Sequence, residues 1–574
     1  MNYRWTYFPD EADVSALAAL SGAGVDDVVL RKCLWNRGCR TSQDVLEFLD
    51  PALKRLRDPF ELMGMDDAVK RITKAVERSE SIVVFGDFDV DGVASAAMLC
   101  RFFQWLKLRI EVYLPDRLEE GYGLSSEAVK TCYEKFHPQL LIAVDCGTTS
   151  VDEIAWMKQN GVDVIVVDHH QAKETSPPAL ALINPHAYPS DLSKGQEFCT
   201  AGLCFKLIHA LVKRWRGDGV ASAEELDVRE LLEWVALATI ADLAPLTGEN
   251  RILVTSGLTR LSQTKQPGLQ ALKQIAKLSG TVGAYEVGFQ LAPRLNAAGR
   301  MESARAAYDL LICDSVEEAR RLASYLDLQN RERQEIEKSA LETALELLAA
   351  QFESSKDYAI VLGDPHWHPG VLGIIASRIS RKFYRLTIIL GGGETQWRGS
   401  GRSVAGFDLA DALKQCHDLL LKYGGHTMAA GVTMERSKVE PLRLRLSELA
   451  KRILGTEGLV PELRLDAEVK LKDLSQLLVE RIEKLAPFGL GNPSVQLCTR
   501  GVTVNGAGHR FGKSCQHIRI PVTDGAAKGE LIWWNAESDR LPVGKCDVVF
   551  TPELNVFQGR TSVRLKLLDW KPST

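Results

Sequence analysis

The sequence predicts an α/β protein with a parallel-sheet domain, a long connector helix, a second α/β domain and a C-terminal β-barrel. Three observations support this. Apolar strands alternate with helical segments between about residues 65 and 250, a long charged stretch without Pro or Gly follows, and the tail holds several short strands. Because 574 residues are too many for one hydrophobic core, we expect three or four domains.

Composition indicates an ordinary globular protein. Hydrophobic residues make up 45% of the chain, charged residues 25%, and the net charge is -5. This charge does not itself indicate nucleic acid, although an acidic metal site would hide a basic groove elsewhere. The twelve cysteines include no C-x-x-C pair, which argues against zinc sites and disulfides and fits a reducing cytoplasm. We find no signal peptide and no apolar run of the ~20 residues that span a bilayer.

The first domain is expected over residues 56–310, after a short helical lead-in at 1–55. Its strands are predicted in SIVVFGDFDV, IEVYLPD, LLIAVDCG, VDVIVVDHH and ALALINP, with helical segments such as SSEAVKTCYEKF between them. Continuous apolar strands joined by helical crossovers form parallel sheets covered on both faces. In such sheets ligands bind at the carboxyl ends of the strands, so the functional site is expected there.

The remaining elements follow from similar patterns. The charged stretch predicts a connector helix over 311–352, and the alternation of YAIVLGD, GVLGIIASRISRKF and LTIILGGG predicts a second α/β domain over 353–457. GTEGLVPE, residues 455–462, has the composition of a linker. Short strands such as HIRIPVTD, GELIWWNA, CDVVFTPEL and TSVRLKLLDW predict a small antiparallel barrel over 458–574.

Acidic and imidazole side chains gather at four places where we expect strands to end. They lie in GDFDVDG, AVDCGTTS, VVDHHQ and ATIADLAPL, and comprise Asp87, Asp89, Asp91, Asp145, Asp168, His169, His170 and Asp242. Buried carboxylates this close together take up protons unless a cation neutralises them. Aspartate with a few histidines and no cysteine suits Mg²⁺ or Mn²⁺. Two such ions would polarise a phosphate and generate hydroxide from water.

Each of these stretches also has a simpler explanation when taken alone. A D-x-D after a strand is often a helix cap or a turn, and a His-His pair is more often structural. All four stretches at successive strand ends favour the metal site.

At this level of detail the sequence resembles the DHH phosphoesterase superfamily, and within it the bacterial single-stranded-DNA exonucleases. The matching motifs run in the family's order from about residue 30 to the end: GDFDVDG, VDCGTTS, VDHHQ, LATIADLAPL, LAPRLNAAGRM, HPGVLGIIASR, GSGRS and GGHTMAAG. The letters DHH alone are a weak signal, whereas PRLNAAGR together with GSGRS and GGHTMAAG is highly specific. The resemblance implies a DHH catalytic domain at 56–310 and an OB-like barrel at the C-terminus.

The resemblance also implies a role for each matched residue. The implied metal ligands are Asp89, Asp91, Asp145, His169 and Asp242. His170 would contact the scissile phosphate or polarise an attacking water, and Asp87 would support the site by orienting a ligand. Phe85 stands where other branches carry a histidine, so one expected ligand is missing. Cys146 stands where Asn or His is usual, and we infer no thiol chemistry from it.

The second α/β domain is implied to bind phosphate. Gly424, Gly425 and His426 would bring backbone N–H groups and an imidazole to an anion, while Arg402 and Ser403 would add a guanidinium and a hydroxyl. Further phosphate contacts are implied for Arg294, Arg300, Gln334 and Arg378. An isolated arginine is more often a solvated surface residue, but the matched motifs favour the phosphate role.

The tail combines positive charge with aromatic residues. Residues 500–574 hold eleven Lys/Arg against seven Asp/Glu, a net of +4. The interleaved aromatics are Phe511, Trp533, Trp534, Phe557 and Trp570. They suit a barrel that stacks on the bases of a single strand, and they suit equally a barrel core.

The activity implied by the resemblance is 5′-to-3′ hydrolysis of single-stranded DNA to 5′-mononucleotides. Mn²⁺ or Mg²⁺ would occupy a two-metal site in a cleft between the two α/β domains. Recombination and DNA repair would be the setting, with a helicase and a single-strand-binding protein as partners. An alternative is a phosphodiesterase for oligoribonucleotides or cyclic dinucleotides, although such superfamily members lack the C-terminal barrel. A non-catalytic scaffold would have lost the Asp and His ligands, which are present here except at Phe85.

Overall fold

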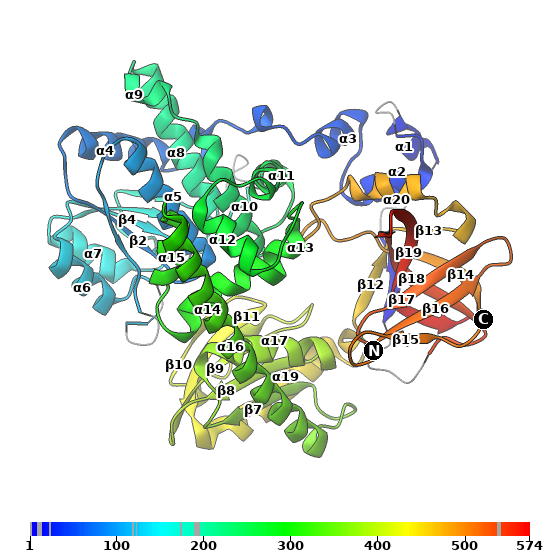
Figure 1. The fold of residues 1–574 in the computed structure, drawn as a ribbon. Coiled ribbons are helices and arrows are strands. Elements are labelled where there is room, and N and C mark those ends of the chain that lie inside the picture. The colour runs from blue at the N-terminus through cyan, green and yellow to red at the C-terminus, as the bar shows by residue number, and fades with distance from the viewer. Residues whose placement is uncertain are drawn as a thin grey trace. The chain divides into compact units, whose positions relative to one another are not determined.

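The computed structural model describes residues 3–8, 14–21, 25–116, 120–121, 123–172, 175–188, 196–536 and 541–573 (Figure 1). The chain forms two compact units. The larger unit comprises Ala52–Leu454 with Gly489–Gly491, and the smaller unit comprises Met1–Pro51, Gly455–Phe488 and Asn492–Thr574.

The larger unit begins with the predicted parallel sheet. Its strand order is β3-β2-β4-β5-β6, and all neighbouring pairs are parallel. The strands are β2 (Ile82–Gly86), β3 (Glu111–Tyr113), β4 (Leu140–Val144), β5 (Asp163–Val167) and β6 (Ala181–Ile183). The helices between and around them are α4 (Met65–Glu77), α5 (Val90–Trp105), α6 (Ser126–Phe136), α7 (Val151–Gln159) and α8 (Thr200–Gly217). The five strands expected from the sequence are therefore confirmed.

Both faces of this sheet are buried, which explains why its strands are apolar throughout. Ile142 of β4 packs into the core that contains α4, α5 and α8, whereas its neighbour Leu141 packs into the core that contains α6 and α7. Side chains that alternate across a strand reach opposite faces, so each strand supplies both layers.

A helical region follows the sheet and leads into the connector. Its elements are α9 (Ala221–Glu224), α10 (Leu232–Ala241), α11 (Gly248–Ser262), α12 (Pro267–Ile275), α13 (Ala284–Glu286), α14 (Ala292–Met301) and α15 (Arg305–Ile312). A short π-helical turn spans Val287–Leu291. The connector α16 (Val316–Gln351) is a single 36-residue helix capped by Ser315, whose hydroxyl accepts from the Glu318 N–H.

The second α/β domain has a mixed sheet with strand order β10-β11-β9-β8-β7. Its elements are β7 (Ala359–Asp364), α17 (Leu372–Phe383), β8 (Leu386–Gly391), β9 (Gln396–Arg402), α18 (Leu409–Lys414), β10 (Lys422–Gly425), β11 (Ala429–Glu435) and α19 (Val439–Leu454). Only β7 and β8, which α17 connects, pair in parallel among these strands; β8 with β9, β9 with β11, and β10 with β11 pair in antiparallel fashion.

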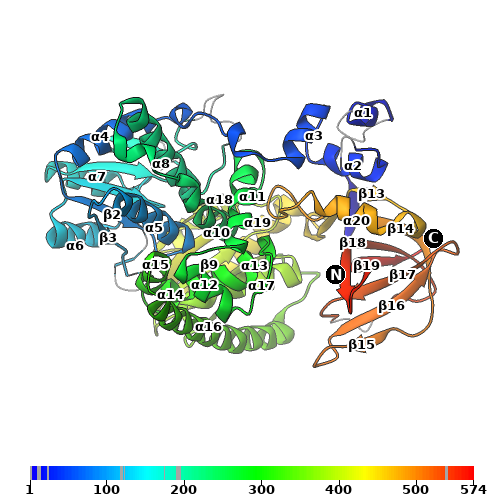
Figure 2. The same ribbon diagram turned by 45° about the horizontal axis from the view of Figure 1, so that its top comes forward.

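The smaller unit contains the predicted barrel (Figure 2). Its sheet has the order β13-β14-β18-β19-β17-β16-β15, and an additional β14–β16 pairing closes five of these strands into a ring. The elements are β12 (Glu462–Leu465), β13 (Ala467–Glu468), α20 (Gln476–Glu483), β14 (Leu497–Val504), β15 (His509–Phe511), β16 (His517–Thr523), β17 (Lys528–Trp533), β18 (Lys545–Phe557) and β19 (Arg560–Pro572). The pairing between β17 and β19 is parallel, whereas a purely antiparallel barrel was expected.

The N-terminal segment belongs to the same unit as the barrel. It contains β1 (Arg4–Tyr7), α1 (Val14–Ala18), α2 (Val28–Asn36) and α3 (Ser42–Leu49). Strand β1 pairs in parallel with β12, and Leu30 and Leu34 of α2 lie in one core with Ile482 and Leu497. A purely helical lead-in is therefore wrong, because one of its strands completes a sheet with a partner more than 450 residues away. Among the described residues, no helix has the length and apolar character required to cross a membrane.

Candidate metal centre

The turn after β2 builds the first part of the site. Asp89 is the N-cap of α5, and its carboxylate accepts hydrogen bonds from the N–H groups of Asp91 and Gly92. A Cβ on Gly92 would lie 2.6 Å from the backbone N and O of Asp87, so only glycine allows the helix to start this close to the strand end. The spacing in GDFDVDG therefore places Asp87, Asp89 and Asp91 around one tight turn.

The first residues of α8 fix two of these carboxylates. The N–H groups of Thr200 and Ala201 donate to the two carboxylate oxygens of Asp91, at 2.7 and 2.8 Å. The Thr200 hydroxyl donates to Asp145 Oδ1 at 3.1 Å. Asp145 follows β4 with a φ of +63°, a left-handed conformation that is uncommon for aspartate and often found at functional sites.

Asp168, which follows β5, organises the two histidines. Its Oδ1 accepts from the N–H groups of His169 and His170 and lies 2.7 Å from His170 Nδ1. Its Oδ2 accepts from the Thr148 N–H at 3.0 Å. This contact fixes the ring orientation of His170 through its Nδ1.

Asp242 reaches the site from a helix. The sequence was interpreted as placing it at a strand end, which is wrong: Asp242 is the C-cap of α10. The segment WVALATIA before it is apolar on every side because α10 is buried on every side, and a short buried helix cannot be told from a buried strand by such a run.

The predicted ligands converge around His169. Its Nε2 lies 3.8 Å from Asp91 Oδ2, 3.4 Å from Asp145 Oδ1 and 3.5 Å from Asp242 Oδ2. Among the described residues, three overlapping sets of ligand atoms could each hold an ion: Asp91, His169 and Asp242; Asp145, His169 and His170; and Asp87, Asp89 and Asp145. Together the sets offer the carboxylates of five aspartates and two imidazoles with no thiolate, which fits Mg²⁺ or Mn²⁺.

Phe85 does not face this cluster. It is fully buried in β2 and packs against Tyr113, with ring centroids 5.3 Å apart, in the core under α6 and α7. The position that carries a ligand in other branches is thus part of the core here.

Burial and mutual repulsion raise the pKa values of three clustered carboxylates. Burial, followed by the charge of Asp91, raises the pKa of Asp145 well above its usual range and that of Asp242 to about 9. Burial also raises the pKa of Asp91. A bound divalent ion would favour the ionised carboxylates and so lower these pKa values, because the metal would take the place of the protons.

The pKa values of His170 and Asp168 shift so that both side chains favour their charged forms. Burial lowers the pKa of His170, but the hydrogen bond and charge of Asp168 outweigh it and raise this pKa to about 9. Burial raises the pKa of Asp168, yet the His170 partner holds it below its usual range. For His169, burial lowers the pKa.

We expect the metal-free protein to lose stability as the pH rises from about 6.5 to about 9. In this window the folded state holds protons on Asp242 and His170 that the unfolded chain has released, since unfolded Asp and His titrate near ~3.9 and ~6.5. Thermal unfolding in chelator across this range measures the effect. Asp242→Asn should flatten the dependence and Mn²⁺ should offset it; a melting temperature that rises with pH would contradict the assignment.

The second α/β domain contributes His426. Its ring lies 6.1 Å from that of His170 between centroids, with an interplanar angle of 24°. Gly424 and Gly425 belong to strand β10, and the His426 N–H donates to the Ala429 carbonyl. The His426 N–H is therefore engaged within the hairpin, whereas its imidazole lies beside that of His170; the phosphate role of the other N–H groups stays a prediction.

Arg402 and Ser403 differ in what they offer an anion. The Arg402 guanidinium donates to the hydroxyls of Ser377 and Ser400 and has no carboxylate partner among the described residues, and burial lowers its pKa. A Cβ on Gly373 would lie 2.9 Å from its Nη2, so this glycine makes room for it. The hydroxyl of buried Ser403 donates to the Phe407 carbonyl at 2.7 Å, which commits its proton to the backbone.

Two of the other predicted phosphate contacts are engaged in ion pairs. Arg294 donates to Asp327 of α16 at 2.9 Å, and exposed Arg378 pairs with Glu337 of the same helix at 2.6 Å. Arg300 donates to the Gly370 carbonyl at 3.3 Å, and Gln334 is exposed on α16. Arg294 and Arg378 therefore fasten α14 and α17 to the connector.

Several residues that organise the site were given no role from the sequence. Asp168 was noted only as part of the cluster, and Thr200 lies in CTAG, which carries no recognisable motif. Asn184 donates to the Thr148 hydroxyl and the His170 carbonyl, and Asn296 of PRLNAAGR accepts from the Val90 N–H at 3.0 Å. A polar side chain buried within an apolar run was the available signal.

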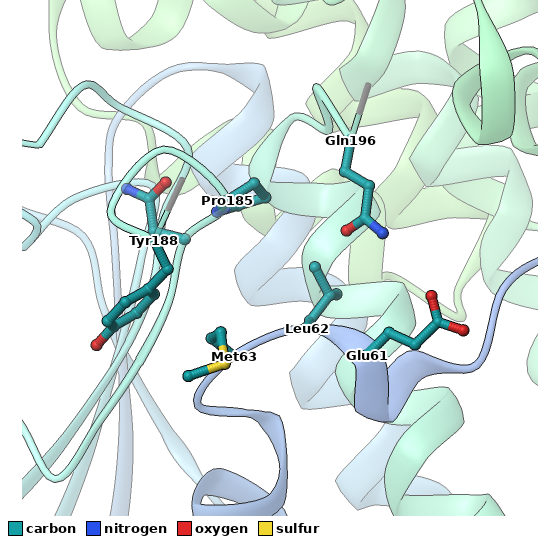
Figure 3. Close-up of a pocket in the computed structure, with 7 residues that line it drawn as sticks. Glu61, Leu62, Met63, Pro185, Tyr188 and Gln196 are labelled. Carbon is teal, nitrogen blue, oxygen red and sulfur yellow. The ribbon is translucent and has the colours of Figure 1, made fainter. Parts of the chain in front are cut away.

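Asn184 also lines a pocket beside the sheet (Figure 3). Its other lining residues are Glu61, Leu62, Met63, Pro185, Tyr188 and Gln196. The labelled side chains come from the 59–63 segment and the chain after β6, so this hollow lies beside the loop that Asn184 ties to His170.

In the barrel, the predicted aromatics divide between core and surface. Trp533 and Trp570 pack against the hydrophobic core. Phe511 and Trp534 form a cluster with His517, Arg519 lies over Phe511, and Phe557 is exposed. The core alternative is therefore confirmed for Trp533 and Trp570, whereas stacking on bases stays a prediction for the aromatics outside the core.

Family comparisons agree with this architecture. The DHH family, N-terminal domain, matches residues 81–239, the DHHA1 domain matches 355–452 and the RecJ OB domain matches 465–569. The single-stranded-DNA-specific exonuclease RecJ of Salmonella typhimurium is 36% identical over 95% of this chain and 96% of its own length. RecJ of Thermus thermophilus, crystallised with Mn²⁺ and with Mg²⁺, gives TM-scores of 0.85 and 0.79 at 30% and 28% identity, covering 100% of this chain and 80% and 79% of the solved chains.

A parallel sheet whose tips carry an aspartate–histidine cluster, followed by DHHA1 and OB domains, defines a protein of the DHH phosphoesterase class. Within that class the chain belongs to the RecJ family of single-stranded-DNA-specific exonucleases. The resemblance stated from the motifs is confirmed.

Proposed function

We propose that this protein hydrolyses single-stranded DNA from the 5′ end and releases 5′-mononucleotides. The observation that carries this proposal is the convergence of Asp91, Asp145 and Asp242 on His169 Nε2 within 3.4–3.8 Å in a member of this exonuclease family. Recombination and DNA repair are the proposed setting, and the cytoplasm the proposed location.

Mn²⁺ or Mg²⁺ is the proposed cofactor at a two-metal site. Relatives of this chain were crystallised with both ions, and the donor atoms here suit them. Asp89, Asp91, Asp145, His169 and Asp242 would hold the ions, which would supply Lewis-acid polarisation of the phosphate and water. Asp87, buried behind this turn, would orient the ligands beside it.

The chain's own residues supply the remaining functions. Asp168 holds the His170 imidazole through Nδ1, and His170 would contact the scissile phosphate or polarise the attacking water. His426 faces His170 from the second α/β domain and would close the site from that side. Arg402, charged and without a carboxylate partner in the described part of the chain, is the proposed anchor for a phosphate.

We assign the binding of long single strands to the barrel. Exposed aromatic side chains such as Trp534 and Phe557 could stack on the bases of a single strand. We keep the proposed division into lead-in, DHH domain, connector, phosphate-binding domain and barrel, with the lead-in folded against the barrel. A helicase and a single-strand-binding protein remain the proposed partners.

A phosphodiesterase for oligoribonucleotides or cyclic dinucleotides is the competing proposal. The match of residues 465–569 to the RecJ OB domain favours the exonuclease. Digestion of end-labelled single-stranded DNA, with and without chelator, distinguishes the exonuclease from the phosphodiesterase. The exonuclease releases mononucleotides from the 5′ end of long DNA, whereas preferential cleavage of dinucleotides would favour the alternative.

We expect Arg402→Gln to weaken binding of a 5′-phosphorylated strand by about 10- to 100-fold, since a charge-assisted hydrogen bond contributes ~1.5–3 kcal/mol. Rates at saturating strand should change less. Arg378→Gln is the matched control, because its guanidinium already pairs with Glu337. Equal losses of affinity in the two variants, or none in Arg402→Gln, would remove Arg402 from the phosphate site.

A further inference from the structure

Thr200 contacts two of the proposed metal ligands at once. Its backbone N–H donates to Asp91 Oδ2 at 2.7 Å and its hydroxyl donates to Asp145 Oδ1 at 3.1 Å. Asp91 lies in the first turn of α5 and Asp145 follows β4, so one residue of α8 joins two segments that are distant in the sequence. Thr200 is fully buried, and Asp91 and Asp145 are 1% and 2% exposed, so no bulk water can replace these donors.

The two contacts oppose the repulsion between the carboxylates. Each ionised carboxylate has about four acceptor positions, so one donor still leaves positions for a cation. The second Asp91 oxygen is held by the Ala201 N–H at 2.8 Å, which fixes the plane of that carboxylate. For Asp145 the Thr200 hydroxyl is the side-chain donor from α8, and without it the carboxylate can turn about χ1 and χ2.

We propose that Thr200 is a positioning residue that sets the orientation of Asp145 relative to Asp91 and so forms the metal site before the ion binds. This inference rests on the proposed metal dependence, and it assigns the preorganisation to one hydroxyl on α8. Outer-shell partners of this kind typically contribute about 10- to 100-fold to metal affinity.

The test compares three substitutions by direct Mn²⁺ binding, followed through the electron paramagnetic resonance signal of free Mn²⁺. Thr200→Val removes the hydroxyl at nearly constant volume and keeps the N–H bond to Asp91. Thr200→Ser restores a hydroxyl. Thr239→Val is the matched control, because Thr239 is equally buried nearby and its hydroxyl donates to the Val235 carbonyl.

We expect Thr200→Val to bind Mn²⁺ about 10- to 100-fold more weakly, with Thr200→Ser and Thr239→Val within about twofold of the unaltered protein. Thermal unfolding in chelator checks that each variant is folded, and Thr200→Ala replaces Thr200→Val if the valine variant is not. Unchanged affinity without the hydroxyl, or equal weakening in Thr200→Ser, would overturn the proposal. Because the readout is binding, an unaltered protein that binds Mn²⁺ but leaves DNA intact would refute the proposed function and not this inference.

Discussion

Asp145→Asn is expected to reduce hydrolysis of single-stranded DNA by at least about a thousand-fold while the protein stays folded. Asp145 takes part in two of the three atom sets that could hold an ion, so its loss weakens more than one of them. The ions' stabilisation of transition-state charge amounts to several kcal/mol, and each ~1.4 kcal/mol corresponds to a factor of ten in rate. Release of nucleotides from a labelled strand with excess Mn²⁺ measures the loss.

The stability of the metal-free variant separates a catalytic from a structural defect. Burial raises the pKa of Asp145, so a neutral amide should leave the melting temperature in chelator equal or higher. Asp309→Asn is the control for the loss of a carboxylate outside the metal site, because Asp309 pairs with Arg305 on α15. Activity near that of the unaltered protein in Asp145→Asn would exclude Asp145 from the metal site.

Removal of the whole smaller unit is expected to weaken binding of long strands by about 10- to 100-fold and to change hydrolysis of short oligonucleotides by less than about threefold. The residue range 52–454 keeps both α/β domains with their cores and loses only Gly489–Gly491 from the larger unit. Stacking contributes ~1–3 kcal/mol per base, so the loss of exposed barrel aromatics accounts for an effect of this size. Fluorescence anisotropy with strands of two lengths measures it.

The place of the cut matters for this experiment. Truncation near residue 460 would leave α2 without the barrel, exposing Leu30 and Leu34 that now lie in its core. We therefore expect that shorter chain to aggregate and the 52–454 chain to remain folded. Equal losses on long and short strands by the 52–454 chain would show that the smaller unit is needed for the catalytic domains themselves.

Much of the candidate site could be predicted because its chemistry is written in local patterns. GDFDVDG combines an apolar strand, an N-cap and a glycine that lets the helix start against the strand, and each of these depends on neighbours within about ten residues. The same holds for DHH, where one carboxylate caps the two residues after it. Such elements fold as the sequence predicts because their main contacts are short-range.

The parts that were missed depend on contacts between distant segments. Asp242 was placed at a strand end because a short buried apolar run has no periodicity that separates helix from strand. Ser403 and the His426 N–H were assigned to phosphate, but their hydrogen bonds go to Phe407 and Ala429. Which partner a donor chooses depends on the backbone that packs beside it.

The sequence by itself determined the α/β class, the five parallel strands, the connector helix, the barrel and the identity of the acidic cluster. Periodicity and turn chemistry encode these features locally. Only the tertiary structure decided that the first fifty residues fold with the segment after Gly455, that Arg294 and Arg378 brace the connector, and that Thr200 joins the first turn of α5 to the end of β4. These depend on which surfaces meet when the chain folds, and no pattern within a short window records that choice.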